Sequence, residues 1–359
     1  MSDQEFLPGS YGLKPENGTL KWRSPSNIAL IKYWGKYGEQ LPKNASLSFT
    51  LSESVTETTV FFEKTTTGVF EFEVYLDGSR TKAFEPKILQ FFERIEAYTP
   101  FLKDYRFRIE TSNSFPHSSG IASSASGFSA LALCLLSLEN ELRTDKMLGQ
   151  YFNRKASFLA RLGSGSACRS IHGPLVVWGE HPAITGSSDY YGSEFPYELH
   201  SVFNNYQDTI LLVDKGEKQV SSSAGHGLMN DHPYAASRFE TAAVNLDKLK
   251  RALISGDLVT FIEIVESEAL QLHAMMMASI PYFILMRPNT LEIISRIWKF
   301  RKETNKSICF TLDAGANVHV LYPESEKQAI MTFIKAELLQ YCKNGDFIVD
   351  HAGPGASQL

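Results

Sequence analysis

Residues 24–36 read Ser24-Pro25-Ser26-Asn27-Ile28-Ala29-Leu30-Ile31-Lys32-Tyr33-Trp34-Gly35-Lys36. Most of this run is apolar and strand-like, yet Lys32 lies inside it. Lysine is seldom fully buried unless its ammonium group is paired with an anion. The run therefore predicts one of two arrangements: a paired, catalytic Lys32, or a lysine at a strand edge whose charged head reaches solvent.

A second segment, rich in small residues, lies between a predicted strand and a predicted helix and reads Pro116-His117-Ser118-Ser119-Gly120-Ile121-Ala122-Ser123-Ser124-Ala125. Small side chains let backbone N–H groups converge, and a helix N-terminus adds donors with a partial positive charge. Phosphate binding is thus predicted, with Ser123 and Ser124 offering hydroxyls to phosphate oxygens or to Mg²⁺. A plain Ser-rich loop that caps a helix fits this segment equally well. The segment is neither a Gly-Lys-Ser/Thr phosphate loop nor a GxGxxG fingerprint.

A third segment repeats this pattern and adds a cation, in the order Gly163-Ser164-Gly165-Ser166-Ala167-Cys168-Arg169-Ser170. Small residues precede a predicted helix, and the planar guanidinium of Arg169 suits a carboxylate or a phosphate. A lone arginine in a turn is more often a surface residue, but two such loops in one predicted domain favour anion binding. Cys168 is better interpreted as a small apolar filler than as a nucleophile.

A fourth segment is a tight turn between two apolar strands, Thr311-Leu312-Asp313-Ala314-Gly315-Ala316-Asn317. It holds one carboxylate, that of Asp313. From this segment alone, the simpler interpretation is a side chain that hydrogen-bonds its own turn.

Length and composition bound the class of protein. The chain has 359 residues, of which 43% are hydrophobic, so two domains with sizeable cores are expected. With 35 basic and 40 acidic residues the net charge is −5, which argues against a nucleic-acid partner or an acidic membrane surface. The longest apolar stretch, Ala130–Leu136, is far shorter than the roughly 20 residues of a membrane span. The first residues, Met1–Ser10, lack the apolar run of a signal peptide.

The four cysteines, Cys134, Cys168, Cys309 and Cys342, show neither CxxC nor Cys/His spacing. A zinc site and a disulfide framework are both poor interpretations of this pattern. The pattern fits a reducing compartment, so a cytoplasmic protein is expected.

The periodicity of apolar residues divides the chain into two mixed halves, 1–200 and 201–359, which we expect to be two α+β domains. In the first half, strands are predicted over Ser46–Leu51, Val69–Leu76, Tyr105–Ser112 and Pro174–Trp178, and helices over Lys87–Tyr98, Gly127–Leu138 and Lys146–Leu162. In the second half, strands are predicted over Thr209–Val213, Ser307–Leu312, Val318–Tyr322 and Phe347–His351, and helices over Ala235–Ile254, Leu258–Ala278, Thr290–Glu303 and Glu326–Tyr341. The segment His181–Pro196 lacks periodicity and is predicted to be an exposed loop near a domain boundary.

Together the four segments resemble the GHMP kinase superfamily and, within it, the mevalonate diphosphate decarboxylase family. The resemblance covers most of the chain, and its most specific pieces are Lys32-Tyr33-Trp34-Gly35-Lys36, Gly163 to Arg169, and Asp313 in Asp-Ala-Gly. It implies an α+β fold with two domains, an N-terminal ribosomal protein S5 domain 2-like α/β sandwich with a left-handed βαβ unit and a C-terminal ferredoxin-like domain. The family's active site lies in the cleft between them, so the phosphate loop would belong to 1–200 and the catalytic Asp to 201–359.

The resemblance also implies an enzyme and its reaction. ATP and mevalonate 5-diphosphate would give isopentenyl diphosphate, ADP, phosphate and carbon dioxide. The γ-phosphoryl group would move to the tertiary hydroxyl of the substrate, and the new phosphate would leave as the carboxylate is lost. The implied cofactors are ATP and Mg²⁺, the implied assembly is a homodimer, and neither a nucleic acid nor a membrane is an expected partner.

Family roles carry over to the matching positions of this chain. Asp313 would orient or deprotonate the tertiary hydroxyl, for which positioning matters as much as basicity. Lys32 would keep Asp313 ionised and offset the negative charge that develops on the phosphoryl group. Arg169 would hold the substrate carboxylate, and Asn27 would orient Arg169. The substrate diphosphate would be bound by Tyr33, Lys36, Ser166 and Arg169.

The nucleotide phosphates would be cradled by Pro116, Ser119, Gly120, Ala122, Ser123 and Ser124. Of these, Ser124 would also be the Mg²⁺ ligand and act in catalysis. The family has a Ser-Ser pair in its second half that faces the transferring phosphate, and the matching run here is Val220-Ser221-Ser222-Ser223. Ser222 is favoured and Ser221 is the alternative, while a simple polar loop remains the competing interpretation. Family members usually carry a methionine soon after this pair, whereas here Ala224-Gly225-His226-Gly227-Leu228 precedes Met229.

Three other functions stay open on the sequence alone. A decarboxylase acting on mevalonate monophosphate (a phosphomevalonate decarboxylase) has less use for the full set of Tyr33, Lys36 and Ser166. A sibling kinase that phosphorylates without decarboxylating needs no carboxylate clamp such as Arg169. A non-catalytic phosphometabolite-binding protein needs no Asp313 together with Lys32.

Overall fold

A computed structural model describes residues 3–116, 121–147, 149–214 and 222–359. Among these residues, an eight-stranded sheet forms around two long antiparallel strands, β1 (Asn17–Ile31) and β4 (Ser46–Lys64). One side of the sheet continues through β7 (Tyr105–Asn113), β5 (Glu71–Leu76) and β6 (Ser79–Arg80). The other end of β4 pairs with β8 (Leu175–Trp178), which pairs with β9 (Gly192–Glu194).

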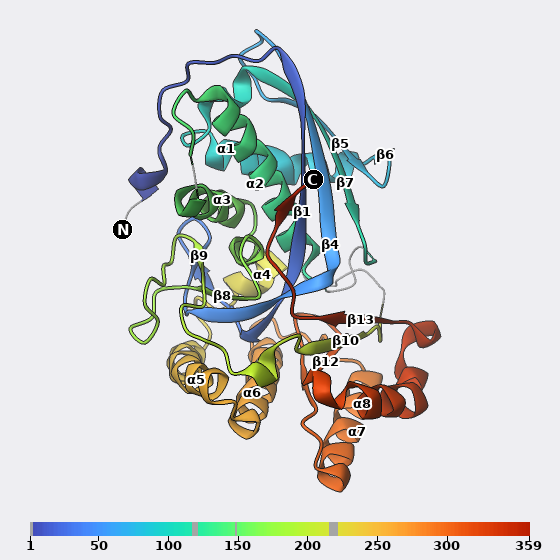
Figure 1. The fold of residues 1–359 in the computed structure, drawn as a ribbon. Helices are drawn as coiled ribbons and strands as arrows, with labels where there is room; N and C mark the ends of the chain where they lie inside the picture. The colour runs from blue at the N-terminus through green and yellow to red at the C-terminus, as the bar shows by residue number, and fades with distance from the viewer. Residues whose placement is uncertain (1–2, 117–120, 148, 215–221) are drawn as a thin grey trace.

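Helices cover one face of this sheet, namely α1 (Glu85–Ile95), α2 (Ser123–Leu142) and α3 (Gly149–Gly163) (Figure 1). The predicted helix near Lys87 is confirmed as α1, whose buried face consists of Ile88, Phe91, Phe92 and Ile95. It begins at Glu85 because Pro86 in its first turn supplies a helical φ and needs no hydrogen bond there.

The second half forms a four-stranded antiparallel sheet in the order β11 (Cys309–Thr311), β12 (Val318–Tyr322), β10 (Gln207–Leu211) and β13 (Phe347–His351). The long helices beside it are α5 (Ala235–Ser255), α6 (Leu258–Met277) and α7 (Pro288–Thr304), followed by the shorter α8 (Lys327–Phe333) (Figure 1). Asp257 caps the N-terminus of α6, and its carboxylate accepts from the Thr260 N–H at 3.1 Å. Its position directly before the apolar helical pattern predicts this cap.

The two halves share one hydrophobic cluster. Ile31 and Leu47 from β1 and β4 belong to the same cluster as Leu246 of α5, Phe261 of α6 and Ile210 of β10. The chain also returns to its start, because β14 (Ser357–Gln358) pairs with β1. Apolar burial across both sheets therefore fixes the end of β1 against the second half.

Three local predictions differ from the structure. The segment His181–Pro196 contains β9, and Ile184 and Tyr191 are buried within it. Polar backbone groups of this irregular segment form hydrogen bonds, such as that from the His181 N–H to Ser187 Oγ. The lack of periodicity in the sequence therefore did not mean that the segment is exposed. The predicted helix over Glu326–Tyr341 is α8 followed by a π-helical turn, Ile334–Leu338, and a 3₁₀ turn.

The third concerns the small-residue run before Arg169. The sequence predicts a loop leading into a helix, whereas residues Gly165–Ser170 themselves form a 3₁₀ helix that holds Arg169. No helix in the described part of the chain combines the length and the apolar character that crossing a membrane requires.

Candidate active site

Lys32 and Asp313 meet at the contact between the two halves. Lys32 directly follows β1 and is 1% exposed, and its Nζ donates to Asp313 Oδ1 at 3.2 Å and to the Ala29 carbonyl at 2.6 Å. Asp313 lies in the turn between β11 and β12. Burial lowers the pKa of the Lys32 ammonium, and the adjacent Asp313 carboxylate opposes that shift. The alternative of a solvated lysine head is therefore wrong.

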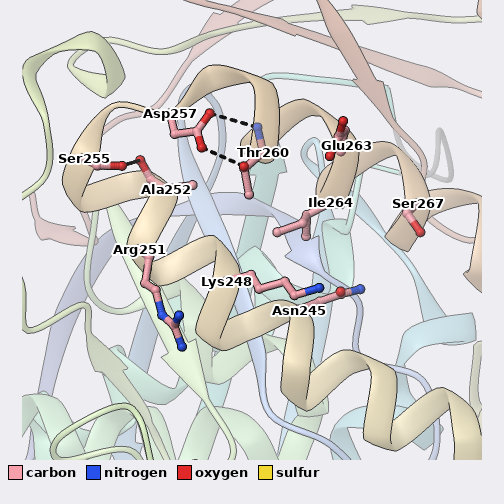
Figure 2. Close-up of a pocket in the computed structure, with 10 residues that line it drawn as sticks. All are labelled: Asn245, Lys248, Arg251, Ala252, Ser255, Asp257, Thr260, Glu263, Ile264 and Ser267. Carbon is pink, nitrogen blue, oxygen red and sulfur yellow. Dashed lines mark hydrogen bonds between the residues drawn. The ribbon is translucent and has the colours of Figure 1, made fainter.

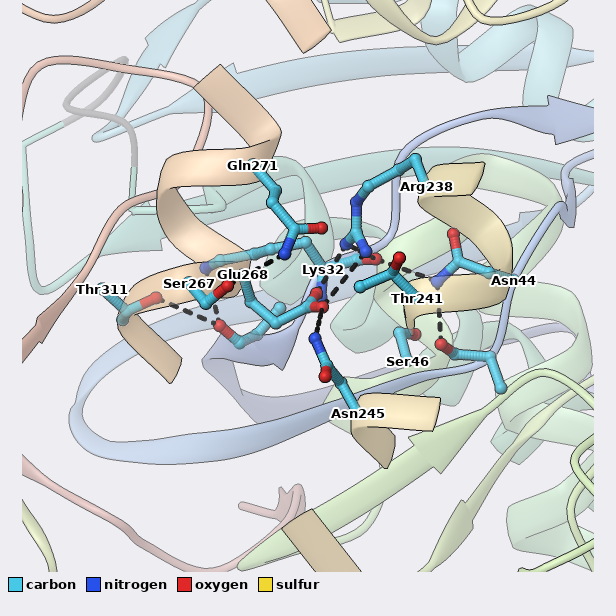
Figure 3. A network of polar contacts seen from close by, with 12 residues as sticks. Lys32, Asn44, Ser46, Arg238, Thr241, Asn245, Ser267, Glu268, Gln271 and Thr311 are labelled. Carbon is cyan, nitrogen blue, oxygen red and sulfur yellow. Dashed lines mark hydrogen bonds and ion pairs between the residues drawn. The ribbon is translucent and has the colours of Figure 1, made fainter. Parts of the chain in front are cut away.

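The backbone of Lys32 is held by a buried ion pair that the sequence did not reveal. Glu268 of α6 accepts the Lys32 N–H at 2.9 Å, and Arg238 of α5 donates to both carboxylate oxygens of Glu268, at 3.1 and 2.5 Å (Figure 3). Asn245 donates to the same carboxylate at 2.8 Å, and Asn44 donates to the Lys32 carbonyl at 3.0 Å. Glu268 shares a helix face with Val265, Ala269 and Leu272, all of which are buried. A charged residue on an otherwise apolar helix face was therefore the sequence signal for this buried ion pair.

Arg169 is buried and held in a fixed direction. Its Nε donates to Asn27 Oδ1 at 3.3 Å, its Nη1 donates to Ser46 Oγ, and its guanidinium lies 5.8 Å from the Trp178 ring centroid. Asn27 is itself fixed, because its amide donates to Ser170 Oγ at 2.8 Å. Burial lowers the pKa of Arg169, whereas Asp313 is among the groups that raise it, so the two charges influence each other. The guanidinium nevertheless stays protonated.

Ser166 shares the 3₁₀ helix of Arg169, and Tyr33 lies beside that helix. The Tyr33 ring lies 4.6 Å from that of Trp178, and a Cβ on Gly165 would lie 2.8 Å from the Tyr33 hydroxyl oxygen. Glycine at 165 therefore lets the 3₁₀ helix carrying the half-buried Ser166 approach Tyr33. Lys36 is half-buried, its Nζ donates to Gln40 Oε1 at 2.9 Å, and burial together with Arg94 lowers its pKa.

The two small-residue loops approach each other at the start of α2. Ser124 is exposed in the first turn, and its Oγ lies 3.5 Å from Ser164 Oγ in the other loop. The Ser26 hydroxyl donates to the Ile121 carbonyl at 2.7 Å, which attaches the loop to β1. Ala122 precedes the helix in a left-handed conformation with φ 42°.

The other predicted phosphate-loop positions are only partly described. Pro116 is exposed, and Ser123 is the first residue of α2. Ser119, Gly120 and Ser221 lie outside the described residues, and Ser222 is the first residue of α4 (Ser222–Gly227).

The start of α2 suits a nucleotide with Mg²⁺. A 20-residue helix presents backbone N–H groups and a partial positive charge at this end, and exposed Ser124 adds a hydroxyl. Within the described ranges, no group of three or more His, Cys, Asp or Glu side chains is arranged to hold a metal. A hydroxyl combined with phosphate oxygens and water is a ligand set that Mg²⁺ accepts.

A groove of about 560 Å³ lies elsewhere, between α5 and α6 (Figure 2). Lys248, Arg251 and Glu263 line it, and neither Lys32, Arg169 nor Asp313 does. This groove therefore lacks the charged groups on which the proposed chemistry depends, and it is not the candidate active site.

Cys168, beside Arg169, fits the predicted role of a filler. It is fully buried, and burial raises the pKa of its thiol to about 12. The thiolate required of a nucleophile is therefore strongly disfavoured. All four cysteines of the chain are buried free thiols.

His273 of α6 holds the backbone of Asp313 in place, a role that the sequence analysis did not predict. Its Nε2 donates to the Asp313 carbonyl at 3.1 Å, and it is 1% exposed. Burial lowers its pKa from an ordinary 6.5 to about 4, so the native protein holds it neutral. No sequence pattern distinguishes His273 from the other histidines, so only the folded structure identifies its role.

The lowered pKa of His273 predicts that the folded protein loses stability in acid. Its contribution to the free energy of unfolding is present above pH 6.5 and is lost as pH falls through about 4, because the unfolded chain then binds a proton that the native state excludes. We expect His273→Gln, which keeps a donor for the Asp313 carbonyl, to flatten this decline by up to about 1.4 kcal/mol per pH unit. Urea denaturation of both proteins across that pH range measures the slopes, and parallel slopes would contradict the assignment.

Comparisons with known proteins agree with this geometry. A sequence model described as the diphosphomevalonate decarboxylase-like N-terminal domain matches residues 24–189. A second, described as the mevalonate 5-diphosphate decarboxylase C-terminal domain, matches residues 209–353. The first range includes Lys32 and Arg169, and the second includes Asp313.

Comparisons over most of the chain extend this agreement. The diphosphomevalonate decarboxylase of Aspergillus fumigatus is 30% identical over 336 residues, covering 88% of this chain and 79% of the relative. A structure concerning mevalonate diphosphate mediated ATP binding by the mevalonate diphosphate decarboxylase from Enterococcus faecalis has a TM-score of 0.80 at 27% identity, covering 96% of this chain and 99% of that one. A structure described as a complex with MVAPP, AMPPCP and magnesium has a TM-score of 0.81 at 29% identity, with the same coverage. These matches confirm the predicted two-domain GHMP kinase fold, and the chain belongs to the diphosphomevalonate decarboxylase family.

Proposed function

We propose that this chain is an ATP-dependent decarboxylase that converts mevalonate 5-diphosphate to isopentenyl diphosphate, ADP, phosphate and carbon dioxide. The observation that carries the proposal is the 3.2 Å contact between Lys32 Nζ and Asp313 Oδ1, made across the two halves of a chain of this family. Solved relatives described with mevalonate diphosphate, ATP, AMPPCP and magnesium support the choice of substrates.

Asp313 and Lys32 serve the phosphorylation step. The Asp313 carboxylate, 26% exposed, orients the tertiary hydroxyl and accepts its proton. The Lys32 ammonium favours the ionised form of Asp313 and stabilises negative charge on the transferring phosphoryl group. The Glu268–Arg238 pair holds the Lys32 backbone in register, so the charge is already positioned before the substrate arrives.

Arg169 serves the decarboxylation step. Asn27 and Ser46 fix two of its donors, and the guanidinium binds the substrate carboxylate until carbon dioxide leaves. Phosphorylation converts the tertiary hydroxyl into a good leaving group. As phosphate leaves, the C–C bond to the carboxylate breaks, and its electron pair forms the C=C bond of the product. A carboxylate clamp near the phosphorylation site distinguishes this sequence of steps from simple kinase chemistry.

The remaining polar residues hold the two phosphate-bearing substrates. Tyr33, Lys36 and Ser166 bind the substrate diphosphate, and Ser222, with Ser221 as the alternative, binds the transferring phosphate. The start of α2, with Ser123 and Ser124, binds the phosphates of ATP, and Ser124 would ligate Mg²⁺. Mg²⁺ supplies charge neutralisation between the phosphates.

A coupled assay of ADP and carbon dioxide, run with mevalonate mono- and diphosphate side by side, tests the function. We expect equimolar ADP and carbon dioxide from the diphosphate. A stable phosphorylated product without carbon dioxide would identify a kinase. Preference for the monophosphate would identify a phosphomevalonate decarboxylase, and no turnover of either would leave a binding protein.

We further propose that the chain divides at residues 200 and 201, works in the cytoplasm and forms a homodimer. The gap between the matched ranges 24–189 and 209–353 supports the division, and buried free thiols suit a reducing compartment. The resemblance to the family supports the dimer, which light scattering after size-exclusion chromatography measures directly.

A further inference from the structure

His226 in α4 lies against the run from Tyr33 to Lys36. Its ring centroid is 4.3 Å from that of Tyr33 and 4.5 Å from that of Trp34, and the residue is 8% exposed. Its Nδ1 accepts the Gly35 N–H at 2.9 Å. Since Nδ1 is the acceptor, the proton of the neutral ring resides on Nε2, which makes Nε2 a donor.

Burial and the charges around His226 keep the ring neutral. Burial, then Lys36 and Arg169, lower its pKa from an ordinary 6.5 to about 3. These two cations are among the groups to which the proposed function assigns the anions of the substrate. A neutral donor adds a hydrogen bond there without adding a third positive charge to desolvate.

Among the described residues, the Nε2 donor has no partner and remains available to a ligand. Within the described ranges, no side chain or backbone oxygen accepts from Nε2. Nε2 is also absent from the fully buried polar atoms without a partner, so this nitrogen is not fully buried. His232, a buried histidine with the same Nδ1 arrangement, uses this donor internally. In His232, Nδ1 accepts the Tyr234 N–H at 3.1 Å, while Nε2 donates to the Met275 carbonyl at 3.0 Å.

We propose that His226 is a substrate-binding residue whose neutral Nε2–H donates to an oxygen of the substrate diphosphate, beside Tyr33 and Lys36. The inference rests on the proposed function for the identity of the ligand. The donor complements the charge of Lys36 by fixing the direction of one phosphate oxygen, because a hydrogen bond is directional and an ammonium charge is much less so.

Two substitutions separate the roles of the ring nitrogens. In His226→Asn, the amide oxygen takes the place of Nδ1 and accepts the Gly35 N–H, but no donor reaches the position of Nε2. In His226→Gln, the amide nitrogen reaches that position. We expect His226→Asn to raise both the Kd and the KM for mevalonate diphosphate about tenfold to a hundredfold, with a smaller change in kcat. We expect His226→Gln to restore most of the affinity.

His232→Asn is the matched control, because it removes an internally used donor, and we expect its Kd to stay within about twofold of wild type. Calorimetric binding of mevalonate diphosphate keeps the test separate from turnover. Wild-type binding without carbon dioxide release would reject the proposed reaction, while the comparison with His226→Asn would still decide the role of His226. Equal affinity of wild type and His226→Asn would overturn the inference.

Nitrogen-15 NMR of the unmutated protein removes any dependence on the folding of variants. We expect the His226 ring at neutral pH to be the neutral tautomer protonated at Nε2, and its Nε2–H resonance to move downfield when mevalonate diphosphate is added. Protonation at Nδ1, or an Nε2–H resonance unmoved at saturating substrate, would refute the proposal.

Discussion

Replacing Asp313 with asparagine is expected to lower kcat by about 10²- to 10⁴-fold while the Kd for mevalonate diphosphate changes little. The substitution keeps the shape of the side chain but removes its basicity and its charge opposite Lys32 Nζ, 3.2 Å away. The substrate's diphosphate and carboxylate would still meet Lys36 and Arg169, so binding should persist. Carbon dioxide and ADP release measure kcat, and calorimetry measures Kd.

Lys32→Met, alone and combined with Asp313→Asn, is the companion experiment. Residues that act as a unit show non-additive effects, so the double variant should be little slower than the worse single variant. Effects that multiply would show that Lys32 and Asp313 act separately. Unchanged turnover in Asp313→Asn would remove this carboxylate from the reaction altogether.

The sequence predicted elements well where a single periodicity governs them. Alternation of Tyr105, Phe107 and Ile109 marked β7 because that strand has one buried face. The segment around Tyr191 was mistaken for an exposed loop because irregular backbone leaves no period to detect, although hydrogen bonds and packing bury it.

The site was predictable only in part, for a physical reason. The apolar neighbours of Lys32 indicated a buried lysine in need of an anion, but nothing local could identify a partner 281 positions away. The resemblance supplied Asp313. Glu268 and His226 were missed because each acts through contacts with the Lys32 to Lys36 run that exist only after folding.

Glu268→Gln is expected to lower the free energy of unfolding by about 3–5 kcal/mol, because it leaves the buried Arg238 guanidinium without a compensating charge. It should also lower kcat about tenfold to a hundredfold with little change in KM, since the Lys32 N–H loses a charged acceptor and its ammonium group shifts relative to Asp313. Chemical denaturation measures the first effect, and steady-state kinetics on the folded protein measures the second.

A second buried ion pair provides the matched control. Glu139 of α2 and Lys155 of α3 are both fully buried, 2.7 Å apart, and neither contacts Lys32 in the described structure. Glu139→Gln should therefore cost a comparable free energy of unfolding while kcat stays within about twofold of wild type. If Glu268→Gln lost stability but matched Glu139→Gln in kcat, the Glu268–Arg238 pair would serve the fold alone. A fall in kcat restricted to Glu268→Gln instead ties the position of Lys32 to an ion pair between two helices of the second half.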